Sequence, residues 1–195
     1  MTKWVIGIDE VGRGPLAGPV ALGACALPVE LNEWSEWEGL KDSKKLSEKR
    51  REEWYARILE DGRVKWAVAA SGSRIIDTKG IVFAIRDAAR RAVEKLQLSP
   101  SEAILMLDRG IMLPKEWQQE QFTKGDELIP AIALASIMAK VTRDRYMVDL
   151  AEKYPVYGFE KHKGYGTKVH IEAIVVHGPA PHIHRNSFLG NIVRE

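Results

Sequence analysis

Short apolar runs separated by turn-forming residues predict β-strands in the first third of the chain. Residues 4–9 (WVIGID) and 19–27 (PVALGACAL) are almost unbroken apolar runs, and the Gly- and Pro-rich stretch EVGRGPLAG between them predicts a turn. Residues 64–70 (VKWAVAA) predict a third strand, so the chain opens as a three-stranded meander. A further buried strand is expected at 103–108 (AILMLD), and a weaker one at 120–123.

Apolar positions with helical spacing predict the remaining elements. Helices are expected over 48–60, 78–97, 130–154 and 168–177. Ser47 and Thr167 stand where N-caps would begin the first and the last of them, and Pro130 suits the first turn of the longest. Strands mixed with covering helices predict an α/β domain in which a mixed sheet is flanked by helices.

The composition is that of an ordinary globular protein. The 195 residues suit one domain, or one domain with a short appendage, and 45% hydrophobic against 29% charged residues argues against extensive disorder. The lone Cys25 lies in an apolar run, as a buried thiol in a reducing compartment would. No apolar stretch approaches the roughly 18 residues that a membrane-spanning helix needs. We therefore expect a cytoplasmic protein that does not contact a membrane.

The positions of the basic residues along the chain are more informative about nucleic-acid binding than the net charge is. The net charge is only +2, but basic residues cluster at 41–51 and 161–168, and all five histidines lie between His162 and His184. A basic, imidazole-rich surface in the last third of the chain would suit a phosphate backbone. For any single cluster, a solvated surface remains the ordinary alternative.

Carboxylates end two of the strands that look buried. Asp9, followed by Glu10, closes the first strand, and Asp108 closes the fourth. A strand-end aspartate often caps a turn, and that explains either strand alone. Several carboxylates together repel one another, however, and require protonation, a basic partner or a metal ion.

The long helix offers a fourth carboxylate. Asp144 lies seven residues after Ile137, and at about 100° per residue it returns to nearly the same face, where Val141 also lies. We therefore predict that Asp144 faces the core. The alternative is an ordinary salt bridge to Lys140 at helical spacing.

Together these acids predict a metal site. The proposed ligands and catalytic residues are Asp9, Glu10, Asp108 and Asp144. Hard oxygen ligands without a cysteine set favour Mg²⁺ or Mn²⁺, and two such ions can clamp the attacking and leaving oxygens of a phosphodiester. The HIH sequence at 182–184 suggests zinc instead, but no second ligand set accompanies it.

Six sequence blocks resemble one family. They are GIDEVGRGPLAGPV (7–20), DSKKLS (42–47), LD (107–108), ASIMAKVTRDRYM (135–147), YGFEKHKGYGT (157–167) and GPAPHIHRNSF (178–188). In this order and spacing they resemble type 2 ribonuclease H, also called ribonuclease HII, and the resemblance extends from about Val5 to Phe188. It implies a ribonuclease H-like fold with a small C-terminal helical segment.

The resemblance also implies an activity. It places the family's catalytic set of three Asp and one Glu on the four acids named above. It implies an endonuclease that hydrolyses the RNA strand of RNA–DNA hybrids and cuts at single ribonucleotides embedded in duplex DNA. The implied products carry 5′-phosphate and 3′-hydroxyl ends, formed with the help of two Mg²⁺ or Mn²⁺ ions.

Substrate contacts are implied by the same blocks. They fall on Gly12, Arg13, Gly14, Ser43, Lys44 and Tyr165. Glycines let the backbone approach a 2′-hydroxyl and phosphate, although the same glycines suit a tight turn. Tyr165 matches the tyrosine that packs on the sugar at the RNA–DNA junction, whereas without the resemblance a loop aromatic folded onto the core would be favoured.

Two organisational predictions and two rival functions complete the picture. Residues 1–154 are expected to form the catalytic core, and residues 155–195 a substrate-binding helix and tail, in a monomer. One rival is another metal nuclease on the same fold, such as type 1 ribonuclease H or a resolvase. The other is an RNA–DNA-binding protein without catalysis, which four clustered acids disfavour because they would repel phosphate.

Overall fold

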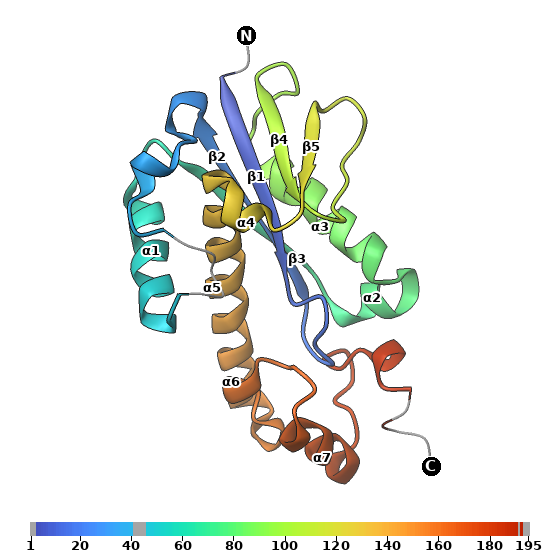
Figure 1. Cartoon of the computed structure of the whole chain (residues 1–195). Coiled ribbons are helices and arrows are strands. Elements are labelled where there is room, and N and C mark those ends of the chain that lie inside the picture. The colour runs from blue at the N-terminus through green and yellow to red at the C-terminus, as the bar shows by residue number, and fades with distance from the viewer. Residues whose placement is uncertain (1–2, 41–45, 191, 193–195) are drawn as a thin grey trace.

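A five-stranded mixed sheet forms the centre of the molecule (Figure 1). The computed structural model describes residues 3–40, 46–190 and 192. The strands are β1 (Trp4–Val11), β2 (Val20–Pro28), β3 (Lys65–Ser71), β4 (Ala103–Asp108) and β5 (Gln119–Phe122), in the spatial order β3-β2-β1-β4-β5. The first three pair antiparallel, and β4 pairs parallel with both β1 and β5. The predicted meander and mixed sheet are confirmed.

Helices cover both faces of this sheet. They are α1 (Glu48–Glu60), α2 (Ser73–Lys79), α3 (Ile81–Lys95), α4 (Gly125–Leu128), α5 (Pro130–Lys153), α6 (Phe159–His162) and α7 (Lys168–His177). Short 3₁₀ helices span Val29–Leu31, Trp34–Trp37, Pro155–Tyr157 and Asn186–Phe188. The side chains of Ser47 and Thr167 accept hydrogen bonds from the third residue beyond them, so both predicted N-caps are confirmed.

The helix predicted over 78–97 was wrong in its extent. The structure has two helices there, α2 and α3, which are divided at Gly80. Gly80 adopts a φ of 82°, which an L-residue with a side chain rarely adopts, and it ends one helix as it begins the next. Apolar periodicity continues across this break and therefore conceals it.

The strand period of two divides the side chains of β1 between two cores. Ile6 and Ile8 face the core beneath α3, whereas Val5 faces the core beneath α1 and α5. Gly7, on the same face as Val5, lies so close to α5 that a Cβ there would come within 2.0 Å of the Ala131 carbonyl carbon. This close contact brings α5 against β1, the strand that carries Asp9.

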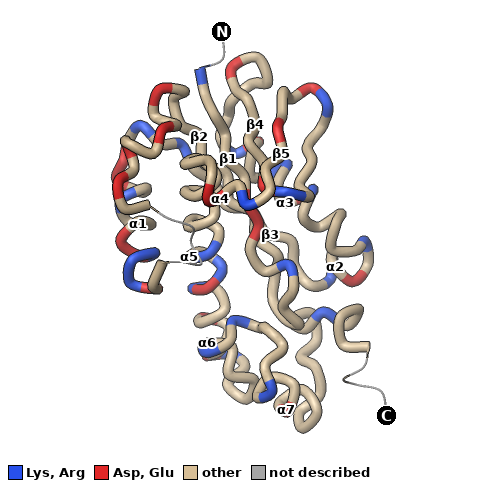
Figure 2. The backbone as a smooth tube through the Cα atoms, in the orientation of Figure 1, with Lys and Arg blue, Asp and Glu red and all other residues tan. Residues whose placement is uncertain are grey.

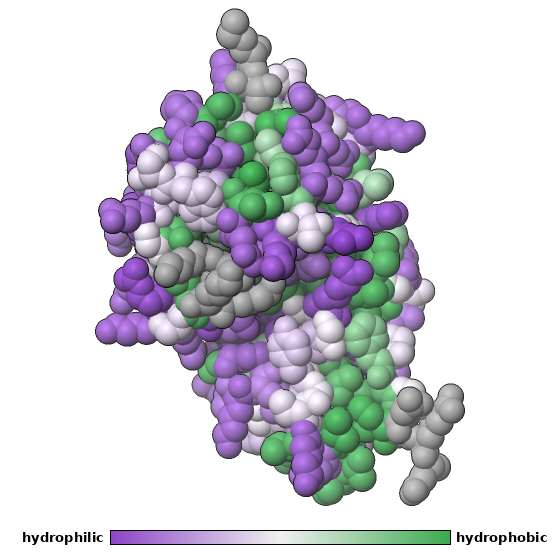
Figure 3. Space-filling model, in the orientation of Figure 1, coloured by the Kyte–Doolittle hydropathy of each residue, from purple (hydrophilic) through white to green (hydrophobic). Residues whose placement is uncertain are grey.

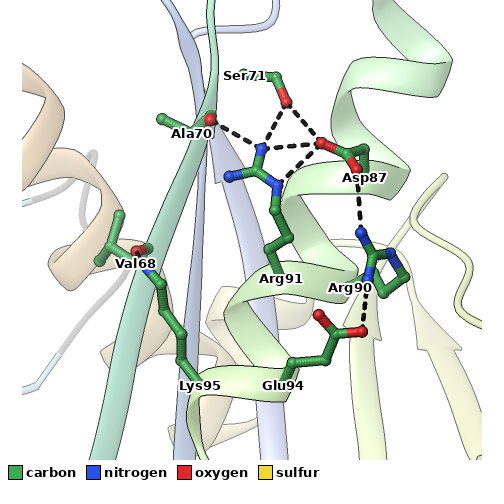
Figure 4. A network of polar contacts seen from close by, with 8 residues as sticks. All are labelled: Val68, Ala70, Ser71, Asp87, Arg90, Arg91, Glu94 and Lys95. Carbon is green, nitrogen blue, oxygen red and sulfur yellow. Dashed lines mark hydrogen bonds and ion pairs between the residues drawn. The ribbon is translucent and has the colours of Figure 1, made fainter.

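A polar network fastens α3 to the edge strand β3 (Figure 4). Arg91 donates to the Ala70 carbonyl at 2.8 Å and to Asp87, and Lys95 donates to the Val68 carbonyl at 2.8 Å. These side chains cover backbone acceptors of an edge strand, which would otherwise invite pairing with another chain. Asp87 forms ion pairs with Arg90 and Arg91, so this acid has an ordinary structural role.

Residues after α5 pack into a third cluster at one end of the sheet. Met147 and Leu150 of α5 meet Tyr157, Phe159 and other side chains of the C-terminal segment there. Hydrophobic residues also gather on the surface of this segment (Figure 3), where α7 exposes Val169, Val175 and Val176. No helix in the described part of the chain is long and apolar enough to cross a membrane.

Candidate active site

Sheet topology brings the strand-end carboxylates together. Because β1 and β4 run parallel with Ile8 opposite Leu107, the next residues on each strand, Asp9 and Asp108, lie side by side. Carboxylate oxygens of Asp9, Glu10 and Asp108 all lie within 4.8 Å of one another. We call these three residues the acid cluster. Figure 2 shows acidic positions on β1 close to α4 and to the basic residues of the neighbouring loops.

Burial makes the acid cluster electrostatically costly. Asp9 is only 5% exposed, and this burial raises its pKa to about 8, an effect that the negative charges of Glu10 and Asp108 increase. A hydrogen bond from Ser136 of α5 partly offsets the rise. Burial and the charge of Asp108 also raise the pKa of Glu10. The folded chain therefore disfavours negative charge on these carboxyl groups unless a cation accompanies them.

The chemistry of these ligands fits a divalent cation. One carboxylate oxygen of Glu10, Oε2, is buried and has no hydrogen-bond partner among the described residues. The other, Oε1, lies 3.4 Å from Nη1 of Arg13, whose side chain is half exposed. Buried carboxylate oxygens that lack donors are the ligands that Mg²⁺ and Mn²⁺ prefer. No other group of three ligands that could hold a metal occurs in the described ranges, so the zinc alternative at 182–184 gains no support.

The sequence prediction missed an additional buried acid, Asp126. It lies on the four-residue α4, is 5% exposed, and its negative charge contributes to the raised pKa of Asp9. Asp108 holds α4 in place, because its Oδ1 accepts a hydrogen bond from the Gly125 N–H at 3.1 Å. Apolar periodicity carries no sign of Asp126. The available signal was an acid in a short polar turn just before the buried helix α5.

Asp144 does not belong to the acid cluster in this structure. Its carboxylate forms an ion pair with Lys140 at 2.8 Å, which is the alternative that the sequence left open. Its side chain is 15% exposed, so the inward-facing direction predicted from the helical wheel is broadly right. Ser136 is the residue of α5 that bonds Asp9, and Asp144 lies about 12 Å further along the helix axis at 1.5 Å per residue.

The predicted substrate loop, Gly12 to Gly14, follows the acid cluster directly. Gly12 has a φ of 84°, and a Cβ on it would come within 2.2 Å of Nε of Arg143, so this position requires glycine. Arg13 and Gly14 are exposed, and a Cβ on Gly14 would meet open space. The loop is therefore both a constrained turn and an accessible surface beside the carboxylates.

Tyr165 also lies at this loop and is not folded onto the core. Its side chain is 42% exposed, and its ring centroid lies 6.0 Å from the guanidinium carbon of Arg143. The preceding Gly164 accepts hydrogen bonds from the N–H groups of Leu16 and Ala17 at 2.8 and 3.3 Å. The remaining predicted contacts, Ser43 and Lys44, lie outside the described residues.

Comparison with known proteins gives the family. The model of the family described as Ribonuclease HII matches residues 6–190. The chain belongs to the ribonuclease HII family. It is 46% identical over 184 residues to the ribonuclease HII of Halalkalibacterium halodurans, which covers 94% of this chain and 66% of that protein. It is 44% identical over 192 residues to the ribonuclease HII of Caldicellulosiruptor bescii, covering 98% and 89% of the two chains.

Solved structures agree with this assignment. In the PCNA:RNase HII complex from Archaeoglobus fulgidus, a chain with 26% sequence identity superposes with a TM-score of 0.74 and 93% coverage of both chains. The ribonuclease H-like fold is therefore confirmed. Ribonuclease HII enzymes are metal-dependent hydrolases that cut the RNA of RNA–DNA hybrids, so type 1 ribonuclease H, resolvases and non-catalytic binding proteins no longer compete.

Proposed function

We propose that this ribonuclease HII cuts at a single ribonucleotide embedded in duplex DNA as well as in longer RNA–DNA hybrids, and that it leaves 5′-phosphate and 3′-hydroxyl ends. The observation that supports this most directly is the position of the acid cluster beside an exposed glycine-bordered loop. The carboxylates suit phosphodiester hydrolysis, and the accessible backbone at Arg13 and Gly14 suits contact with a 2′-hydroxyl.

We infer that the acid cluster holds two Mg²⁺ or Mn²⁺ ions during the reaction. Asp9, Glu10 and Asp108 would be the ligands. For the fourth acid, burial and proximity to Asp9 favour Asp126 over the Asp144 expected from the sequence, whose carboxylate is already paired with Lys140. Bound ions of this kind lower the pKa of coordinated water and neutralise charge on the phosphate.

The chain's own residues would orient the substrate for this hydrolysis. The oxygen of water would form the new bond to phosphorus as the water gives up a proton to solvent. The bond from phosphorus to the 3′-oxygen would break, and that oxygen would take up a proton from solvent and leave as a hydroxyl. Arg13 would contact the phosphate, and the peptide groups from Gly12 to Gly14 the 2′-hydroxyl. Tyr165 would pack against the sugar at the junction.

Other parts of the substrate site remain predictions. Ser43 and Lys44 are proposed to contact phosphate, and the whole segment 155–195 is proposed to bind the duplex. Its basic residues near α6, visible in Figure 2, are consistent with that role. The monomeric state and the cytoplasmic location also stay predictions.

The deciding experiment is cleavage of a DNA duplex that contains one ribonucleotide, with the cut position mapped. We expect a single cut at a phosphodiester next to the ribonucleotide, dependent on Mg²⁺ or Mn²⁺ and absent in EDTA. Asp149→Asn, which changes an exposed acid of α5, is the matched control and should cut normally. Cleavage of long hybrids without cleavage of this duplex would reject the single-ribonucleotide activity.

A further inference from the structure

Two adjacent buried residues of the C-terminal segment, His184 and Arg185, lie against the β1–β2 loop. They are 1% and 0% exposed. The backbone runs antiparallel to the loop, with a bridge between Ala17 and His184. Arg185 N–H donates to the Leu16 carbonyl at 2.8 Å, and Gly18 N–H donates to the Ile183 carbonyl at 2.9 Å. The segment thus forms an isolated antiparallel bridge beside the proposed substrate loop.

The Arg185 side chain holds the loop by its carbonyl groups. Its Nη2 donates to the Gly12 carbonyl at 2.6 Å, its Nη1 to the Arg13 carbonyl at 2.9 Å, and its Nε to the Gly18 carbonyl at 2.9 Å. A planar guanidinium fixes three acceptors in one orientation, which a lysine ammonium cannot reproduce. Because carbonyl oxygens repel phosphate, turning those of Gly12 and Arg13 toward a buried cation favours an anion on the outer side of the loop.

The His184 side chain reaches the other proposed substrate element. Its Nδ1 accepts from the Ala180 N–H at 2.9 Å, so its proton is on Nε2, which lies 3.1 Å from Nε2 of His170. Nδ1 of His170 lies 2.9 Å from the Tyr165 carbonyl, which can only accept. His170 therefore carries its proton on Nδ1 and accepts from His184. Two neutral imidazoles connect residue 184 to the backbone of Tyr165.

Residues that flank the two substrate elements, Ala17 and Gly164, touch directly, and their contact leaves little room. A Cβ on Gly164 would come within 2.5 Å of the Ala17 carbonyl oxygen. A small displacement of either loop would therefore change the separation between the Gly12–Gly14 peptide groups and Tyr165. A pair of residues that anchors both loops controls that separation.

We propose that His184 and Arg185 are positioning residues that hold the Gly12–Gly14 loop and Tyr165 at a fixed separation, so that one ribonucleotide is recognised by both together. The inference rests on the proposed substrate roles of those two elements. Neither His184 nor Arg185 is required to touch the nucleic acid. At a single ribonucleotide, the Gly12–Gly14 loop and Tyr165 must both make contact in one register, whereas a long hybrid offers many registers. We call His184 and Arg185 the clamp, and we expect it to matter most for cleavage at a single ribonucleotide.

The test compares kcat and KM for two substrates, a duplex with one ribonucleotide and a uniform RNA–DNA hybrid. The variants are Arg185→Lys and His184→Gln, and the matched control is Arg74→Gln on α2, which changes an exposed residue outside the proposed duplex-binding segment. We expect kcat on the single-ribonucleotide duplex to fall by at least about tenfold, since small misplacements of reacting groups are costly. On the hybrid, kcat should fall less than about threefold, and stabilisation by Mg²⁺ should be unchanged.

A double-mutant cycle separates positioning from general damage to the fold. If His184 acts through Tyr165, His184→Gln should add less than about a twofold loss in a Tyr165→Ala background. Equal losses on both substrates, or independent effects in the cycle, would overturn the inference. If His184→Gln does not fold, His170→Asn, which keeps a donor to the Tyr165 carbonyl but removes the acceptor for His184, is subject to the same two criteria.

The same experiment distinguishes this inference from the proposed function. If the unaltered protein does not cut at a single ribonucleotide, or if Tyr165→Ala cuts it normally, the proposed function fails. If both behave as expected while the variants of the clamp lose activity equally on both substrates, only the positioning role is rejected.

Discussion

The acid cluster and the clamp both border the β1–β2 loop, but their buried charges are satisfied in opposite ways. In the acid cluster, carboxylates face one another, and Glu10 Oε2 has no donor in the described part of the chain. In the clamp, Arg185 donates from all three nitrogens to carbonyls, and both ring nitrogens of His184 are bonded. The clamp is complete within the chain, whereas the acid cluster is complete only with a cation.

Burial shifts the pKa values of the buried groups in the two regions in opposite directions. It raises the pKa of Asp9 to about 8, which favours the neutral acid, and it lowers the pKa of Arg185 to about 9, with the neighbouring Arg143 adding to the effect. In both places the folded chain disfavours charge. The difference is that Arg185 keeps its hydrogen bonds without a ligand. Changes in the acid cluster should therefore remove activity and spare the fold, and changes in the clamp should disturb geometry.

The largest expected effect comes from Asp9→Asn. We expect kcat to fall by at least about 10³-fold, because the amide supplies no negative charge to a metal ion. At pH 7 the melting temperature of the metal-free protein should rise by several degrees, because Asn removes the free-energy cost of keeping the buried Asp9 carboxyl protonated beside its acidic neighbours. Calorimetry in EDTA and a cleavage assay measure the two effects. Retained turnover would take Asp9 out of the metal site, and a lower melting temperature would contradict the electrostatic cost.

A comparison of Asp126→Asn with Asp144→Asn tests which of the two acids acts with the acid cluster in binding metal ions. We expect Asp126→Asn to lower kcat by about 100-fold and to weaken activation by Mg²⁺, because Asp126 is buried near Asp9. Asp144→Asn should lower kcat less than about fivefold, because it breaks a partly exposed ion pair with Lys140. Mg²⁺ titrations of the cleavage rate provide the measurement. The reverse order would restore Asp144 as the fourth acid.

These two aspartates show what the sequence could and could not predict. Strand ends are predictable from apolar runs, so the pattern singles out Asp9 and Asp108 as strand-end acids. Their adjacency depends on the parallel pairing of β1 with β4, which the apolar runs do not specify. The helical wheel gave the face of α5 on which Asp144 lies. It did not give the distance of Asp144 from the acid cluster, because that distance depends on how far α5 extends along the sheet. Asp126 lies in a turn without periodicity, and its position depends on the tertiary hydrogen bond from Gly125 to Asp108. The clamp likewise depends on contacts between residues about 170 positions apart.

Tyr165 connects the clamp with the substrate, and its effect should be intermediate. Tyr165→Ala is expected to lower kcat/KM about tenfold or more at a single ribonucleotide, because the ring that would pack on the sugar is lost. Tyr165→Phe keeps the ring and is expected to retain most of the activity. Steady-state kinetics on the one-ribonucleotide duplex are the measurement, with the uniform hybrid as the reference. An unchanged rate for Tyr165→Ala would reject the junction role.

The smallest effect is on the free energy of unfolding. Its pH dependence should have opposite signs for Asp9, in the acid cluster, and for His170, which contacts the clamp. Asp9 keeps its proton up to about pH 8 in the folded chain but loses it near pH 3.8 when unfolded, so metal-free stability falls as the pH rises toward 8. His170 binds its proton near pH 4 when folded and near 6.5 when unfolded, so its stability contribution falls as the pH decreases from 6.5 to 4. Below pH 6.5 the contributions of Asp9 and His170 to the slope of unfolding free energy against pH oppose each other. Between pH 6.5 and 8, of these two contributions only that of Asp9 remains, at up to about 1.4 kcal/mol per pH unit. Urea unfolding in EDTA should show this decline, and Asp9→Asn should remove it while leaving the His170 slope below pH 6.5; a decline that survives in Asp9→Asn would assign it to another group.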